Sequence, residues 1–102
     1  MRKCLVYQKD ILSGHLLEHQ QNIRYEFQYL PDYQGNPISL TMPIQEAPYW
    51  WDKFPPFFDG LLPEGYQLEA LLRRLKIDHD DPFSQLIATG NDMVGSVTIE
   101  EV

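Results

Sequence analysis

Residues 55–65, PPFFDGLLPEG, place two adjacent phenylalanines and two adjacent leucines between turn-forming residues. The three prolines and two glycines of this stretch exclude one continuous helix. Its large apolar side chains still need an apolar environment, and they are Phe57, Phe58, Leu61 and Leu62. The stretch therefore predicts one helical turn over residues 57–62 that enters a hydrophobic core, binds a partner, or does both.

The chain before this stretch has the pattern of an antiparallel sheet. Short apolar runs at residues 4–7 and 11–17 flank residues 8–10, which predicts a hairpin. A further strand is predicted at residues 38–42, where Ile38, Leu40 and Met42 alternate with polar residues. The clearest alternation predicts a strand with one apolar face, formed by Ile23, Tyr25, Phe27 and Tyr29.

The C-terminal part of the chain has the pattern of two helices and a final strand. Residues 66–75 carry leucines at helical spacing, which predicts a helix whose apolar stripe faces the sheet. A second helix is marked by Asp81 as its N-cap, Pro82 at its first position and Gly90 just after its end. Residues 93–99 then predict a strand that returns to the sheet.

These elements predict one α+β domain over residues 1–102. The sheet is expected to be small and antiparallel, with about five strands, either open or curled into a barrel, and packed by two main helices. Residues 46–56 predict an irregular segment, because they are rich in proline. The side chains expected to be buried are Phe27, Leu40, Leu71, Leu72, Phe83 and Leu86.

The composition is that of a globular protein with an acidic surface. Hydrophobic residues make up 43% and charged residues 23% of the chain, which disfavours disorder. The formal net charge of −7 argues against electrostatic binding of nucleic acid, which needs clustered Lys and Arg. Arg73, Arg74 and Lys76 form the one basic cluster of the sequence. Protein partners are therefore favoured over nucleic acid.

Cysteine content and hydropathy indicate a cytoplasmic protein. Cys4 is the only cysteine, which excludes an intrachain disulfide and favours a reducing compartment. The apolar run after Arg2 and Lys3 ends at Gln8, so it does not predict an export signal. No stretch approaches the roughly 20 apolar residues that cross a bilayer. We therefore expect no membrane partner.

Residues 15–19, HLLEH, match the H-x-x-E-H pattern in which two histidines one helical turn apart bind zinc beside a general-base Glu. That chemistry requires a helix, whereas this segment follows Gly14 and lies between strand-like runs. A catalytic site would also need a further ligand. We interpret the segment as a solvated hairpin edge and predict neither a metal nor another cofactor.

The other catalytic patterns are incomplete. Residues 60–65 and 90–95 have the G-x-x-x-x-G spacing of a phosphate-binding loop, but neither is followed by the required Lys and Ser or Thr. His79-Asp80-Asp81 lacks the downstream Asn of a kinase catalytic loop. Cys4 lies in an apolar strand, where a thiol is usually inert. The sequence therefore predicts a protein that is not an enzyme.

Aromatic residues are the best candidates for partner binding. Trp50 and Trp51 are adjacent, so an extended backbone would point them to opposite faces and expose one of them. Tyr66 begins a predicted helix after three turn-forming or polar residues, where its ring either anchors a partner or caps the core. The predicted partner-binding residues are Trp50, Trp51, Phe57, Phe58, Leu61, Leu62, Pro63, Glu64, Gly65 and Tyr66.

PPFFDGLLPEG and the leucine-rich segment that follows it resemble the N-terminal subdomain of HipA-type toxin kinases. Two further motifs occur in the order of that family, PISLTMP at residues 37–43 and NDMVGSVTIE at residues 91–100. The resemblance therefore spans nearly the whole chain, without the paired tryptophans. Its matching residues are Pro37, Ser39, Leu40, Phe57, Phe58, Leu61, Leu62, Pro63, Gly90, Val94, Gly95 and Val97.

The resemblance implies a stand-alone antitoxin, similar to HipS, from a three-component toxin–antitoxin system. Its implied partners are a short HipA-like serine/threonine kinase and a helix-turn-helix DNA-binding protein. We expect the chain to inhibit the kinase without chemistry of its own, with residues 62–66 as the inhibitory element. One alternative is a structural subunit that bridges the kinase and the DNA-binding protein for promoter repression, and another is a small metalloenzyme.

Overall fold

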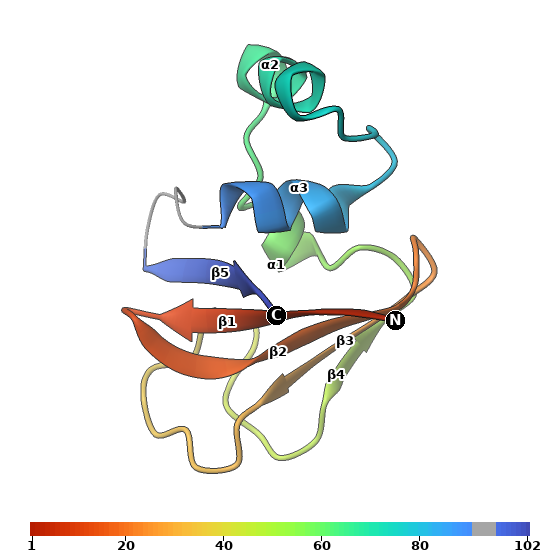
Figure 1. The fold of residues 1–102 in the computed structure, drawn as a ribbon. Coiled ribbons are helices and arrows are strands. Elements are labelled where there is room, and N and C mark those ends of the chain that lie inside the picture. The colour runs from red at the N-terminus through yellow and green to blue at the C-terminus, as the bar shows by residue number, and fades with distance from the viewer. Residues whose placement is uncertain (91–95) are drawn as a thin grey trace.

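A five-stranded antiparallel sheet forms the centre of the computed structural model, which describes residues 1–90 and 96–102 (Figure 1). The order across the sheet is β4-β3-β2-β1-β5, and all neighbouring strands are antiparallel. Because β4 and β5 form its two edges, the sheet is open and does not close into a barrel. The predicted α+β class is confirmed. The strands are β1 (Arg2–Gln8), β2 (Ile11–Gln20), β3 (Arg24–Tyr29), β4 (Tyr49–Trp51) and β5 (Val97–Glu101).

The predicted N-terminal hairpin is confirmed, with a turn of two residues between β1 and β2. Lys9 and Asp10 have φ angles of 50° and 66°, and a type I′ turn requires positive values at both central positions. The backbone N–H of Lys9 also donates to the carbonyl oxygen of Ser96, at 2.7 Å. The turn is therefore tied to the start of β5, which pairs with β1.

The apolar side chains of β3 enter the core as their alternation predicts. Tyr25 and Phe27 are fully buried, and Tyr29 is nearly so. Ile23 was expected on the same face, but it is 51% exposed because the strand begins one residue later, after Asn22 with a φ of 63°. The left-handed backbone at Asn22 turns the chain, so the side chain of Ile23 does not continue the alternation.

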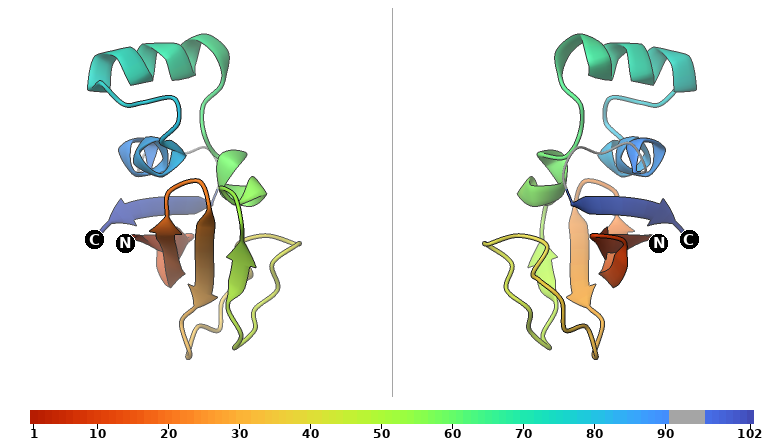
Figure 2. Two further views of the ribbon diagram at one scale, coloured as in Figure 1. Left: turned by 90° about the vertical axis from the view of Figure 1, so that its right-hand side faces the viewer. Right: turned by 90° about the vertical axis from the view of Figure 1, so that its left-hand side faces the viewer.

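Two helices cover the apolar face of the sheet, α1 (Pro56–Asp59) and α3 (Pro82–Thr89) (Figures 1 and 2). The predicted helical turn within residues 57–62 is thus present as α1. Phe58 of α1 is fully buried, with its ring 5.9 Å from that of Phe27. The fully buried side chains of α3 are Phe83 and Leu86, both of which were predicted core residues.

Helix α3 begins and ends where its caps predict. The carboxylate of Asp81 accepts a hydrogen bond from the backbone N–H of Ser84 at 3.2 Å, and Pro82 holds the first helical position. Gly90 follows the last turn with a right-handed φ of −55°. Glycine is required here by close packing, because a Cβ added at Gly90 would overlap the backbone of Ile99. The backbone N–H of Ile99 donates a hydrogen bond to the Gly90 carbonyl oxygen.

The helix α2 (Gly65–Leu75) does not face the sheet, contrary to the prediction from its leucine stripe. It lies on the far side of α3 in every view (Figures 1 and 2). Leu72 is its buried residue, Leu71 is half-buried, and Leu75 is 44% exposed. Helices α1 and α3 already cover the apolar face of the sheet. Helix α2 therefore packs outside them, and most of its surface is exposed to solvent.

The prediction of a strand with a buried Leu40 is also wrong. The backbone N–H of Met42 donates to the carbonyl oxygen of Ser39 at 3.1 Å, which closes a tight turn with Leu40 at its tip. The chain therefore reverses where a strand would continue. Ile38 and Met42 both enter the core on either side of the turn, whereas Leu40 is 99% exposed.

Strand β4 lies within the segment that was predicted to be irregular. Its three residues pair with β3, Tyr49 opposite Phe27 and Trp51 opposite Tyr25. Because β4 is short and lies at the edge of the sheet, the proline before it removes no interior hydrogen bond. The predicted final strand is confirmed from Val97 onward, whereas residues 93–95, with Val94 and Gly95 of the third motif, lie outside the described residues.

Candidate functional site, an exposed aromatic corner

The chain between α1 and α2 forms a corner, residues 61–66, that is anchored in the core. After α1, the backbone N–H groups of Leu61 and Leu62 donate to the carbonyl oxygens of Phe58 and Asp59, both at 3.1 Å. Phe58 is fully buried beneath this turn and packs edge-on against Phe57, at 5.2 Å between ring centroids. The start of the corner is therefore held by these backbone hydrogen bonds and by the buried side chain of Phe58 beneath it.

The backbone at the start of α2 directs Tyr66 away from the protein. Glu64 is extended, with a φ of −124°, and Gly65 has a φ of +59°, a conformation that favours glycine. The side chain of Tyr66 is 94% exposed as a result. Tyr66 therefore does not cap the core, which was the alternative left open by the sequence. Phe57, Leu61, Leu62 and Pro63 are half-buried around the same corner.

A cleft of about 520 Å³ lies behind the corner, between the starts of α2 and α3. Its apolar wall includes Leu62 and Leu68. Three carboxylates contribute to its lining, from Asp59, Glu64 and Asp80, so the cleft is suited to a basic or amphipathic group. No sequence pattern indicates this cleft, because its walls come from three segments that are far apart along the chain.

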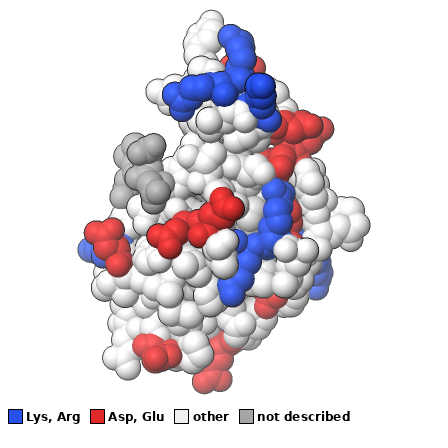
Figure 3. Space-filling view, in the orientation of Figure 1, with Lys and Arg blue, Asp and Glu red and all other residues white. Residues whose placement is uncertain are grey.

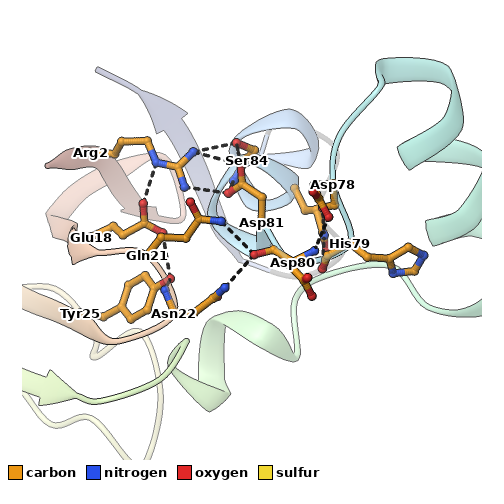
Figure 4. Close-up of polar contacts among 11 residues, drawn as sticks. Arg2, Glu18, Gln21, Asn22, Tyr25, Asp78, His79, Asp80, Asp81 and Ser84 are labelled. Carbon is orange, nitrogen blue, oxygen red and sulfur yellow. Dashed lines mark hydrogen bonds and ion pairs between the residues drawn. The ribbon is translucent and has the colours of Figure 1, made fainter.

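A polar network joins the first strand to the start of α3 (Figure 4). The guanidinium of Arg2 donates to the carboxylate of Glu18 at 2.6 Å, to Asp81 at 2.7 Å and to the hydroxyl of Ser84 at 2.8 Å. Glu18 is 4% exposed, and its second carboxylate oxygen accepts from the hydroxyl of Tyr25 at 2.8 Å. Both oxygens of this buried carboxylate are therefore satisfied, and Arg2 supplies its counter-charge.

The wall of the cleft opposite the corner is formed next to this network, where the β2–β3 turn meets the link between α2 and α3. The side-chain amides of Gln21 and Asn22 both donate to the carbonyl oxygen of Asp80, at 3.0 and 2.9 Å (Figure 4). The side-chain amide of Gln85 donates to the carbonyl oxygen of Asp78 at 3.0 Å. The first two bonds hold the link between α2 and α3 against the β2–β3 turn, and the third holds it to α3. The wall of the cleft opposite the corner is thus fixed by side-chain hydrogen bonds.

Acid should weaken this network through Asp81. Burial tends to raise the pKa of Asp81, but hydrogen bonds from Arg2 and Ser84 outweigh it, and the pKa lies below its ordinary value. Stability from Asp81 is therefore complete above the ordinary Asp pKa of about 3.9 and is lost as the pH falls below it. We expect the free energy of unfolding in urea to fall less between pH 5 and pH 3 in Asp81→Asn than in wild type.

The control for this pH prediction is Asp52→Asn, which removes one exposed carboxylate away from the network. Asn is also an effective N-cap, so the Asp81 variant mainly removes the charge that faces Arg2. An equal loss of stability on acidification in Asp81→Asn, Asp52→Asn and wild type would contradict the role given to Asp81.

The paired tryptophans point to opposite faces of β4, as an extended backbone requires. Trp51 packs against the core, with its ring 6.2 Å from that of Tyr49. Trp50 is 45% exposed on the other face, beneath the guanidinium of Arg24 at 4.3 Å and stacked with His19 at 5.3 Å. The structure therefore does not bring Trp50 together with the Tyr66 corner.

The HLLEH segment is part of strand β2, which removes the helix that a zinc-peptidase motif requires. Histidines four residues apart on a strand are separated by about 13 Å, too far to share one metal ion. Glu18 lies on the opposite face, bound to Arg2 and Tyr25. Among residues 1–90 and 96–102 no cluster of three or more His, Cys, Asp or Glu could hold a metal.

We expect the double variant His15→Ala with His19→Ala to remain folded and to keep its partner-binding activity. Its histidines are surface groups, so the free energy of unfolding should change by about 1 kcal/mol or less, mainly through the lost pair of His19 with Glu26. Elemental analysis should find no stoichiometric zinc in wild type. Stoichiometric zinc in wild type that disappears in the double variant together with function would contradict this assignment.

Cys4 is buried in β1, in accord with the sequence. Burial raises the pKa of its thiol to about 12, so the thiol stays protonated at neutral pH. It has the character of a small core residue rather than that of a nucleophile.

Known proteins are similar to this chain in sequence and in fold. The family model for the HipA N-terminal domain matches residues 4–100. The chain belongs to the HipA N-terminal domain family. It is similar to a solved N-terminal domain of HipA toxin, with 31% identity and a TM-score of 0.77 over 100% of this chain and 93% of that one. It is also 40% identical, over 77 residues, to an uncharacterized protein of Haemophilus influenzae (strain ATCC 51907 / DSM 11121 / KW20 / Rd), covering 76% of this chain and 73% of the relative.

These matches confirm the family resemblance of the sequence motifs. They relate the chain to the N-terminal domain of HipA and not to the catalytic kinase portion. In the part of the chain that is described, no helix has the length and apolar character needed to span a membrane.

Proposed function

We propose that this protein is an antitoxin that binds and inhibits a short HipA-like serine/threonine kinase toxin, without catalysis of its own. Its membership of the HipA N-terminal domain family supports a role within a HipA-type system. The observation that carries the proposal is the almost fully exposed ring of Tyr66 on a corner anchored by the buried Phe58. An exposed aromatic on a rigid base is the kind of residue that dominates a protein interface.

The proposed mechanism is physical obstruction of the kinase. Tyr66 enters or lies beside the nucleotide or substrate site of the kinase, and the half-buried Leu61, Leu62 and Pro63 extend the apolar contact around it. Glu64, which is exposed and lines the acidic cleft, pairs with a basic group of the kinase. Because the start of the corner is hydrogen-bonded to α1 and rests on the buried Phe58, its binding should cost little conformational entropy.

The proposed setting is a cytoplasmic complex that also contains a helix-turn-helix DNA-binding protein. This chain has a net charge of −7, so direct contact with DNA falls to that third protein rather than to this one. A role as a bridging subunit would require binding to the kinase without inhibition, and this difference is measurable.

Co-expression tests the proposal in cells. The kinase toxin of the same system, expressed alone, should arrest growth of the host, and co-expression of this chain without the DNA-binding protein should restore it. Growth arrest that persists although this chain is soluble and co-purifies with the kinase would contradict the antitoxin role and favour the bridging role.

A further inference from the structure

Helix α2 presents a continuous outward stripe opposite its leucines. Tyr66, Ala70 and Arg73 are spaced four and three residues apart, which places them on one face of the helix. All three are exposed, and Arg74 lies exposed beside them. Glu69 lies at the edge of the same face, and its carboxylate pairs with His79 at 2.9 Å. The outward stripe thus has the ring of Tyr66 at the start of the helix and the arginine side chains near its end.

The end of α2 gathers positive charge in an otherwise acidic protein. Arg73, Arg74 and Lys76 are three of its eight Lys and Arg residues and lie within four positions. Figure 3 shows Lys and Arg side chains together over α2, at the top of the molecule. Lys76 ends the helix in a left-handed conformation. Ion pairs among residues 1–90 and 96–102 involve Arg2, His19 and His79, and none involves these three cations.

The position of α2 leaves this stripe accessible. The helix lies beyond α3 and buries only Leu72, so it contributes little to the core of the domain. Basic residues in the last turn interact favourably with the helix dipole. That effect requires only a position near the end of the helix, and it does not account for the alignment of Arg73 with Tyr66.

Resting on the proposed function, we propose that the outward stripe of α2 is a docking surface for an acidic patch of the partner kinase. Tyr66 anchors one end in an apolar pocket, and Arg73 and Arg74 pair with carboxylates of the kinase. Seven residues of helix separate Tyr66 from Arg73 by about 10 Å along the axis. The kinase should therefore carry clustered Asp or Glu about two helical turns, or about 10 Å, from the pocket that receives Tyr66.

Charge complementarity favours an acidic patch of the kinase as the partner of this surface. Each guanidinium can bind a carboxylate with two parallel hydrogen bonds, which fixes the orientation of the helix on the partner. The remaining surface of the chain, with its excess of Asp and Glu, would repel the same acidic patch. The basic end of α2 therefore sets which face of this protein meets that part of the kinase.

Charge reversal tests the proposal. Binding of the purified kinase to immobilised chain is measured by surface plasmon resonance at low and at physiological salt. The double variant Arg73→Glu with Arg74→Glu should bind about tenfold more weakly or worse, and its affinity should depend less on salt than that of wild type. Lys3→Glu with Lys53→Glu makes the same change in net charge at exposed positions outside α2 and should stay within about twofold of wild type.

The outcomes separate the two proposals. If wild type does not bind the kinase, the proposed function itself fails. If wild type binds and the α2 variant, folded by circular dichroism, binds as tightly as the Lys3 and Lys53 control, the docking surface is wrong while the proposed function stands. Fluorescence anisotropy with duplex DNA provides a further arm, because DNA binding at physiological salt that is lost in the α2 variant would assign the stripe to nucleic acid and overturn the proposal.

Discussion

Replacing Phe58 by alanine is expected to lower the free energy of unfolding by about 3 to 5 kcal/mol. Phe58 is fully buried, and its ring contacts those of Phe27 and Phe57. Truncation leaves a cavity at the point where the corner is attached to the sheet. Because small domains are stable by only about 5 to 15 kcal/mol, this loss approaches the whole stability of the fold. Urea unfolding followed by circular dichroism measures it.

Leu40→Ala is the matched control for Phe58→Ala. Leu40 belongs to a family motif and was expected in the core, yet its side chain is 99% exposed at the tip of a turn. Its truncation should change the free energy of unfolding by about 0.5 kcal/mol or less. A loss of less than about 1 kcal/mol for Phe58→Ala would show that the corner is not anchored as described. A large loss for Leu40→Ala would contradict the exposed position of Leu40.

Tyr66→Ala is expected to weaken binding to the kinase by about 2 kcal/mol or more, roughly thirtyfold in affinity, and to abolish inhibition at stoichiometric concentration. The fold should be unaffected, because the side chain is 94% exposed and supports no core contact. Circular dichroism, melting temperature and kinase inhibition should be measured on one preparation of the variant.

Tyr66→Phe separates the ring of Tyr66 from its hydroxyl group. If the apolar ring is the anchor, this variant should inhibit almost as well as wild type. Inhibition by Tyr66→Ala at wild-type potency would remove the corner from the mechanism. Trp50→Ala would then be the next variant to test, since Trp50 is exposed on the opposite face of the sheet.

Local patterns predicted the parts of the fold whose structure depends on nearby residues. The alternation of β3 from Tyr25 to Tyr29 and the caps of α3 were both predicted correctly, because period and capping are properties of short segments. The exposure of Tyr66 was one of two alternatives from the sequence. The positive φ of Gly65 favours it, and glycine at that position was the available signal.

The errors arose where tertiary contacts override a local pattern. Ile38 and Met42 alternate with polar residues as a strand would, yet the turn between them reverses the chain and leaves Leu40 in solvent. The three-residue strand β4 has almost no period of its own and forms because β3 offers it an edge. The leucine stripe of α2 was a sound helix signal, but it could not tell which surface the helix would meet.

The cleft and the Arg2 network could not be predicted, since they join segments that are remote in sequence. Arg2 meets Asp81 and Ser84 only because β1 lies beneath the start of α3. Asn22 and Asp80 form one wall of the cleft because the β2–β3 turn meets the link between α2 and α3. No spacing rule connects such positions.

Titration of the purified kinase with this chain alone tests the central claim most directly. Phosphate transfer by a fixed amount of the HipA-like kinase is measured as the chain is added, in the absence of the DNA-binding protein, while size-exclusion chromatography follows complex formation. The proposed function predicts that activity falls to background as the complex saturates and that Tyr66→Ala leaves it high. Full kinase activity in a saturated complex would contradict the inhibitory role.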